Sequence, residues 1–227
     1  MQNENKIYSE TPHLIFCEGV DAYFFLIWFL DFIKQQNSAF ASFRVYNFGG
    51  INDLSKYLRT FSKLDGFCKI VRSICVVRDA ETNASSAVES IRASLRNCGF
   101  AVPGTSCSKA VDTGLYPQIA TGFVLFPEIG ERPKSGTLED LCLRILATEN
   151  VETMLEHVNT TLEQYRDQLP RLHKNRLHTF FSLTDKFVSL RIGEAAKCRA
   201  FDYEKPEMRL LKSFLLRMVD GCGGEGS

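Results

Sequence analysis

The chain has 227 residues, of which 44% are hydrophobic and 24% are charged, a composition that excludes intrinsic disorder and collagen-like structure. The 27 basic residues equal the 27 acidic residues, so the formal net charge is zero and a globally basic protein that coats nucleic acid is excluded. Phosphate binding therefore has to come from local positive charge or from a bound metal ion.

Membrane and redox signals both favour a cytoplasmic protein. The longest apolar run, residues 22–30, is too short to span a bilayer, and residues 1–10 are polar and lack the pattern of a signal peptide. The eight cysteines include no pair at CxxC spacing, so neither a zinc site nor a disulfide framework is favoured. We expect reduced, mostly buried thiols and no membrane association.

Strand and helix signals alternate over the first 146 residues. Buried strands are indicated by short apolar runs at residues 13–17, 43–48, 74–77 and 123–126. Helices are predicted after each strand, starting near residues 21, 52, 86 and 137. This order predicts an α/β fold with a parallel sheet of about four strands and helices on both faces. Residues 104–121 are rich in Gly, Ser and Thr, and a loop is expected there.

Strand signals fade after residue 150, and amphipathic helices are predicted instead, the last of them beginning at Pro206. We therefore expect an α/β domain at residues 1–150, a helical extension packed on it at residues 151–220, and a disordered tail at residues 221–227. Residues 171–217 hold 11 basic and 5 acidic residues. This local excess is either a solvated helical face or a source of cations for a phosphate site.

Acidic residues follow three of the predicted strands. Glu18 follows the first strand, Asp79 and Glu81 end the third, and Glu139 and Asp140 begin the helix after the fourth. Because the carboxyl ends of parallel strands meet at one edge of a sheet, these carboxylates are expected to converge there and to hold Mg²⁺ or Mn²⁺. Each also has a structural interpretation; Thr137 with Asp140, for example, is a capping-box pattern.

Two of these strand ends resemble the signature motifs of the Toprim domain. Residues 14–19, LIFCEG, with Asp21 two residues later, resemble its first motif, and residues 75–81, CVVRDAE, resemble its second, Asp-x-Asp motif. Glu81 stands where that motif usually has its second aspartate. Further segments, at residues 49–50, 122–127, 136–140 and 180–202, are similar to a little-characterised prokaryotic family of stand-alone Toprim proteins related to the overcoming-lysogenization-defect nucleases.

The resemblance covers most of the chain. It implies a Toprim-like (Rossmann-like) sheet and Mg²⁺- or Mn²⁺-dependent phosphodiester hydrolysis on DNA or RNA. It implies Glu18 as a metal ligand or general acid/base, Asp79 and Glu81 as Mg²⁺ ligands, and a transition-state lysine at Lys174. Further candidates for a second metal position are Glu139, Asp140 and Asp21. Related nucleases are fused to or paired with ATPases, often in phage defence, so an ATPase partner is expected.

Other functions compete with this interpretation. Glu81 and the zero net charge also fit a Toprim interaction module with little or no catalysis inside a larger complex. A receiver-like or phosphatase-like domain is disfavoured, because it needs a nucleophilic aspartate where this chain has Glu18. The histidines that flank Lys174, His173 and His178, are expected to be structural, and Trp28 is expected to lie in the core rather than to stack on bases.

Overall fold

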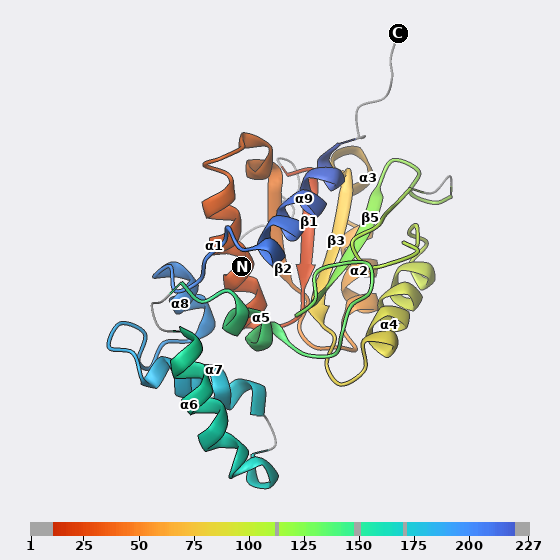
Figure 1. Cartoon of the computed structure of the whole chain (residues 1–227). Helices are drawn as coiled ribbons and strands as arrows, with labels where there is room; N and C mark the ends of the chain where they lie inside the picture. The colour runs from red at the N-terminus through yellow and green to blue at the C-terminus, as the bar shows by residue number, and fades with distance from the viewer. Residues whose placement is uncertain (1–10, 112–113, 148–150, 170–171, 221–227) are drawn as a thin grey trace.

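The computed structural model describes residues 11–111, 114–147, 151–169 and 172–220, so the predicted tail at residues 221–227 lies outside it. A five-stranded sheet runs through the described chain in the order β2-β1-β3-β5-β4 (Figure 1). Its parallel strands are β2 (Phe43–Asn47), β1 (His13–Cys17), β3 (Ser73–Asp79) and β5 (Ala120–Phe126). The α/β class and the four parallel strands are as the sequence predicts.

The fifth strand, β4 (Lys109–Ala110), pairs antiparallel with β5 and makes the sheet mixed. It lies in the segment expected to be a loop, so the prediction of about four parallel strands was incomplete. A strand of two residues is too short to produce a hydrophobic alternation. The strand is recognised by its pairing with β5, which the sequence of residues 109–110 does not reveal.

Helices cover both faces of the sheet. One face packs against α1 (Val20–Ile33) and α9 (Pro206–Val219), and the other packs against α2 (Leu54–Ser62), α3 (Phe67–Ile70) and α4 (Ala84–Asn97). Two hydrophobic clusters result, because successive side chains of each strand point to opposite faces. The continuous apolar sequence of the strands follows from this two-sided burial.

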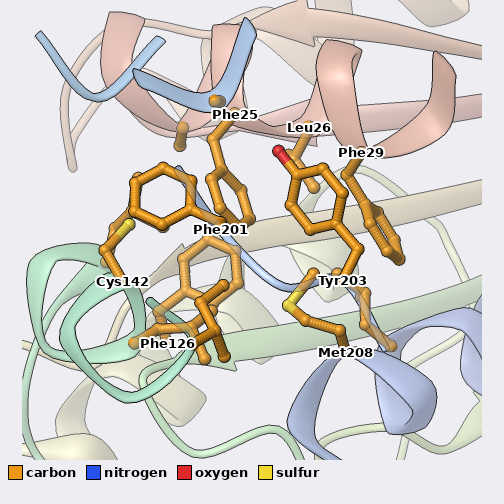
Figure 2. Close-up of a cluster of buried hydrophobic side chains, with 14 of the residues drawn as sticks. Phe25, Leu26, Phe29, Phe126, Cys142, Phe201, Tyr203 and Met208 are labelled. Carbon is orange, nitrogen blue, oxygen red and sulfur yellow. The ribbon is translucent and has the colours of Figure 1, made fainter. Parts of the chain in front are cut away.

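The cluster under α1 is rich in aromatic side chains (Figure 2). Phe25 of α1 contacts Phe126, Phe201 and Tyr203 edge-on, with ring centroids between 5.7 and 6.1 Å apart. Edge-to-face contacts of this kind are favourable and directional. They tie the end of β5 and the segment before α9 to α1, and so they fix the carboxyl edge of the sheet.

The remaining helices lie near that carboxyl edge. They are α5 (Leu138–Arg144), α6 (Val151–Glu163), α7 (Leu172–Ser182) and α8 (Ile192–Lys197). A 3₁₀ turn, Arg166–Gln168, lies between α6 and α7, and another, Ser38–Ser42, lies between α1 and β2. In Figure 1, α5 sits at the ends of the strand arrows, with α6 and α7 beyond it. Contacts join α7 to α5 and to α6, and α8 to α1. Buried residues of α6–α9 belong to the same hydrophobic cluster as α1.

The division into parts at residues 1–150 and 151–220 stays a prediction. Across the described residues, none of the helices combines the length and the apolar character that crossing a bilayer requires.

The contact between α9 and β5 gives a test of the fold. A Cβ on Gly122 would lie 2.6 Å from Phe214 Cζ and 2.9 Å from Met218 Sδ, so α9 packs directly on the glycine backbone. We expect Gly122→Ala to lower the free energy of unfolding by about 1–3 kcal/mol through overpacking. Urea denaturation measures the change.

Gly104→Ala is the matched control, because a Cβ there meets nothing within 4 Å and Gly104 has no positive φ. It is expected to be neutral or slightly stabilising. Equal stability of the two variants would contradict the packing of α9 on β5.

Candidate functional site

Glu18 is held at the carboxyl edge by the pairing of β1 with β3. Cys17 is the register partner of Val77, and the Glu18 backbone N–H donates to the Val77 carbonyl at 3.0 Å. Gly19 follows with a φ of 82°, a conformation that glycine adopts without steric cost and that turns the chain into α1. The acid of the first motif therefore lies beside the end of β3.

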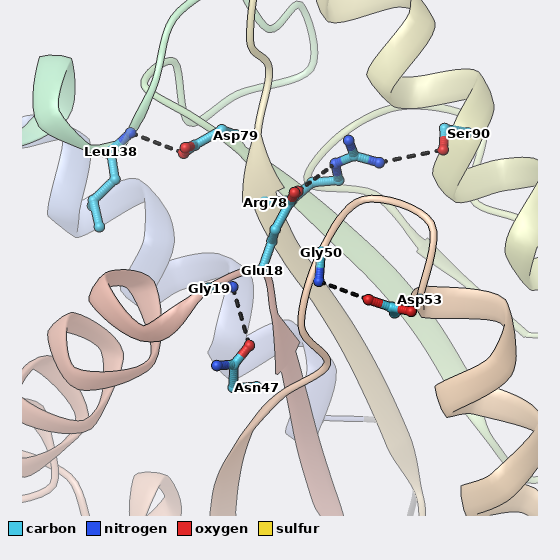
Figure 3. Close-up of polar contacts among 9 residues, drawn as sticks. All are labelled: Glu18, Gly19, Asn47, Gly50, Asp53, Arg78, Asp79, Ser90 and Leu138. Atoms are coloured by element: carbon cyan, nitrogen blue, oxygen red, sulfur yellow. Dashed lines mark hydrogen bonds and ion pairs between the residues drawn. The ribbon is translucent and has the colours of Figure 1, made fainter. Parts of the chain in front are cut away.

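A buried arginine pairs with Glu18 (Figure 3). Arg78 is 1% exposed, and its Nε lies 3.2 Å from Glu18 Oε2, while its Nη1 donates to Ser90 Oγ of α4 at 3.3 Å. The Arg78–Glu18 pair has the distance of an ion pair but not the angles of a hydrogen bond. Burial raises the pKa of Glu18, the Arg78 charge opposes this, and Glu81 adds to the rise.

Asp79 is the most perturbed carboxyl of the edge. Its Oδ1 accepts a hydrogen bond of 2.9 Å from the Leu138 backbone N–H at the start of α5 (Figure 3). Burial, followed by the charge of Glu139, raises the pKa of Asp79 from 3.8 to about 8, with smaller contributions from Glu81 and Glu18. Carboxylates influence one another this strongly only when they are close and poorly solvated. The charges of Glu139, Glu81 and Glu18 therefore act on Asp79, and Glu81 does so from an exposed position.

Glu81 reaches the same edge through a strained backbone. Its φ is 54°, in the left-handed region that few glutamates adopt. Two backbone hydrogen bonds with Gly136, of 2.8 and 2.7 Å, hold it there and join the β3 end to the loop before α5. Strain of this kind is most often found at functional sites.

Glu139 brings in the cation from the C-terminal helices. Glu139 is 4% exposed, and its Oε1 lies 3.1 Å from Lys174 Nζ of α7. Burial alone would raise the pKa of Glu139. The hydrogen bond from its own backbone N–H, the Lys174 ammonium and the Thr137 hydroxyl outweigh burial and lower that pKa. Among the described basic residues between 172 and 217, Lys174 is thus the one that forms an ion pair with a predicted site acid.

Two of the predicted site residues have other neighbours. Asp140 Oδ2 accepts from the Thr137 backbone N–H at 2.9 Å and from its hydroxyl at 3.3 Å, so this carboxylate caps α5. Asp21, in the first turn of α1, lies at the border of the cluster. It helps Glu139, Asp79 and Asp140 to raise the pKa of the buried Cys142 thiol, after burial itself, but it is not among the groups that shift Asp79.

The converging carboxylates offer the hard oxygen ligands that Mg²⁺ and Mn²⁺ prefer. Within the described ranges, no three acidic, histidine or cysteine side chains are already gathered as metal ligands. The acids instead have protein partners, which are Arg78 for Glu18, the Leu138 amide for Asp79 and Lys174 for Glu139. The residues fit such an ion by charge and chemistry, and they would have to exchange these partners to bind it.

Sequence reasoning missed the role of Arg78, which it included only within the segment 75–81 that resembles the second Toprim motif. The available signal was its position. Arg78 is a charged residue next to Asp79 in an apolar strand, and alternation turns it to the opposite face, toward α4. A buried charge needs a partner, and Glu18 and Ser90 supply it.

Taken together, the fold and this edge define an α/β protein whose mostly parallel sheet carries an acidic cluster at the carboxyl ends of its strands. The chain belongs to the family described as protein of unknown function (DUF3226), whose family model matches residues 12–220. Comparisons with curated proteins and with solved structures gave no match. The matched region includes both the acidic edge and Lys174.

The pKa of Asp79 predicts how stability depends on pH. The folded protein keeps a proton on Asp79 between pH 3.8 and about 8 that the unfolded chain releases, so the stabilising contribution is lost as the pH rises through this window. Asp79→Asn retains an acceptor for the Leu138 N–H and does not titrate. At pH 8.5 without metal, we expect the free energy of unfolding of Asp79→Asn to exceed that of the wild type by on the order of 1 kcal/mol or more.

Urea denaturation of both proteins from pH 5 to 8.5 measures this difference. Asp31→Asn, at an exposed acid paired with Lys34, is the control and should follow the wild type. Parallel pH profiles for the wild type and Asp79→Asn would show that Asp79 is ionised normally.

The Arg78–Glu18 pair predicts a non-additive effect of two substitutions. Arg78→Met should cost about 3 kcal/mol of stability, because it leaves the Glu18 charge partly buried without its partner. Adding Glu18→Gln removes that charge and should recover part of the loss. Denaturation of the two single variants and the double variant gives the coupling energy. Strictly additive effects would mean that the two charges do not interact.

Proposed function

We propose that this protein is a Toprim-like nuclease that hydrolyses phosphodiester bonds in DNA or RNA with Mg²⁺ or Mn²⁺ bound at the acidic edge. The observation that carries the proposal is the convergence of four carboxylates, Glu18, Asp79, Glu81 and Glu139, from three separate segments of the chain onto one edge. The order of the acids along the chain, with Glu18 before Asp79 and Glu81, matches the two motifs that resemble Toprim.

The acids differ in the way that catalysis requires. Asp79 and Glu139 are the most enclosed, and they are the proposed principal ligands, with Glu81 completing the metal site. Glu18 keeps a partner charge in Arg78 and a raised pKa, which suits a group that exchanges a proton with water or with the leaving oxygen. The bound metal would supply charge neutralisation and an activated water.

Lys174 is the proposed cation for the substrate phosphate. Its ammonium is 3.1 Å from Glu139 and the side chain is 40% exposed, so it lies at the acidic cluster and still reaches solvent. If Glu139 held a metal ion, the Lys174 ammonium would be free to contact the oxygens of a phosphodiester. A single positive charge facing the scissile group stabilises the negative charge that builds up in the transition state.

The wider setting is part of the same proposal. An acidic site on a chain with no net charge has limited means of holding a long polymer by itself. A cytoplasmic complex with an ATPase subunit, acting in prokaryotic phage defence, would bind the nucleic acid more strongly and would restrict cleavage to the proper target.

A second function is a Toprim interaction module that has lost most of its catalysis. Two observations favour it: Glu81 replaces an aspartate on a strained backbone, and the acids are paired with protein groups rather than gathered as ligands. In that case the edge would be a structural charge network. This module would bind neither Mg²⁺ nor Mn²⁺ but would still form a complex.

Cleavage of labelled single-stranded and duplex DNA and RNA with Mg²⁺ or Mn²⁺ tests the nuclease. We expect Glu18→Gln, Asp79→Asn and Lys174→Ala each to lower the rate on the order of 10²-fold or more, because each removes a proton carrier, a ligand or the phosphate contact. Glu89→Gln is the matched control, since Glu89 is an exposed acid on α4 that pairs with Arg92. It should keep full activity.

Equal rates in the wild type, Glu18→Gln and Asp79→Asn would exclude the assigned site. Calorimetric titration with Mg²⁺ and Mn²⁺ separates the two functions. Binding that is lost in Asp79→Asn supports the nuclease, whereas no binding together with a stable protein complex supports the interaction module.

A further inference from the structure

An open hollow of about 650 Å³ lies next to the acidic edge, between α1, α7 and α8. Its walls combine apolar, aromatic and charged side chains. The residues that matter here are Asp21, Phe24, Trp28, His178, Arg191 and Lys197. Neither the sheet core nor the carboxylate cluster accounts for this combination.

The aromatic wall comes from one uncovered face of α1. Phe24 and Trp28 stand one helical turn apart, and Phe24 is 44% exposed. The expectation that Trp28 lies in the core holds only in part, because Trp28 is partly buried against the core cluster. It packs against the core at one side and lines the hollow at the other, since α1 is apolar around most of its circumference while its neighbours cover only part of it.

Close packing holds the aromatic wall in position. A Cβ on Gly193 would lie 2.5 Å from Phe24 Cβ, so the backbone of α8 packs directly against the Phe24 side chain of α1. The approach brings Lys197 over the Trp28 ring, with 5.6 Å between Nζ and the ring centroid. The hollow therefore has a rigid wall rather than a loose loop.

The cations of the hollow are available to a ligand. Within the described part of the chain, Arg191 and Lys197 take part in no ion pair, and Lys197 lies over the Trp28 ring. The acid Glu194 lines the hollow too, but its Oε2 accepts the Arg191 backbone N–H at 2.9 Å. Unpaired cations beside aromatic rings match a group that has both a phosphate and a flat ring.

The hollow adjoins the acidic edge through α7 and Asp21. Lys174 and His178 are four residues apart on α7, which puts both side chains on one face, about 6 Å apart. Lys174 contacts Glu139 of the acidic cluster, whereas His178 lines the hollow. Asp21 also belongs to both, because it lines the hollow and lies near Cys142 together with Glu139 and Asp79.

We propose that this hollow is a nucleobase subsite for single-stranded DNA or RNA, with a base on Trp28 and Phe24 and its phosphate on Arg191 and Lys197. The inference rests on the proposed nuclease function and defines its substrate as an unpaired strand. The distance of about 6 Å between the Lys174 and His178 side chains is comparable with the distance between successive nucleotides of a strand. A strand with its scissile phosphate at Lys174 thus presents the adjacent base to the hollow.

The fluorescence of the full-length protein tests this directly, because Trp28 is the only tryptophan in the chain. Titration with an eight-nucleotide oligothymidylate, without divalent metal, is expected to quench the emission by stacking. An abasic strand of equal length, which retains the phosphates, is expected to quench it far less. Equal quenching by both strands, or by a hairpin duplex, would overturn the subsite, since stacking needs an unpaired base.

Variants measured by anisotropy of a labelled oligothymidylate test the residues. Trp28→Leu, Phe24→Ala and Arg191→Ala should each weaken binding about 10-fold, and Trp28→Phe should restore most of the affinity. Phe24→Ala keeps the Cβ against which Gly193 packs. Leu210→Ala, at an exposed apolar residue of α9, is the matched control and should bind as the wild type does. Unchanged affinity in all three hollow variants would overturn the proposal.

The two proposals fail separately. Base-dependent quenching without any metal-dependent cleavage supports the subsite and contradicts the hydrolysis. Cleavage of single strands with no quenching, and with rates unaffected by Phe24→Ala or Trp28→Leu, supports the hydrolysis and contradicts the subsite.

Discussion

The mutual repulsion of carboxylates is the constraint around which the carboxyl edge is built. Parallel strands end at a common edge, so the acids that follow β1 and β3 and the acid at the start of α5 meet there. The fold compensates each one differently: a buried guanidinium at Glu18, an ammonium at Glu139, and a raised pKa at Asp79. A surface built only for stability would not concentrate such costs, and this concentration is what supports the proposed cation-binding site.

The compensating groups come from distant parts of the chain, which links the two halves of the sequence. Arg78 and Ser90 belong to β3 and α4 on one face of the sheet, whereas Lys174 belongs to α7 beyond α5. The shared hydrophobic cluster that joins α1, α5 and α7 holds Lys174 of α7 in place relative to the acidic edge. The helices after residue 150 therefore contribute chemistry to the edge as well as buried surface, and α8 adds the cations of the hollow.

Much of the fold could be predicted because its signals are local. Apolar runs and helix starts indicated the four parallel strands, and their connectivity implied that Glu18 and Asp79 share an edge. The two-residue β4 and the partner of Arg78 could not be predicted, since each depends on pairing across the fold. The function of Asp140 as a cap of α5 stayed ambiguous, because a capping box and a ligand position have the same spacing. The exposed side of Trp28 depended on what its neighbours leave uncovered.

The contact between Lys174 and Glu139 also bears on when the acidic edge can be completed during synthesis, because the ion pair needs both residues. Translation runs from the N-terminus, so all the acids of the cluster leave the ribosome before the lysine that offsets one of them. A nascent chain that stops short of α7 carries the carboxylates without this countercharge. Assembly of the acidic edge is thereby timed to the last quarter of the polypeptide, and a truncated product would be left with an incomplete centre.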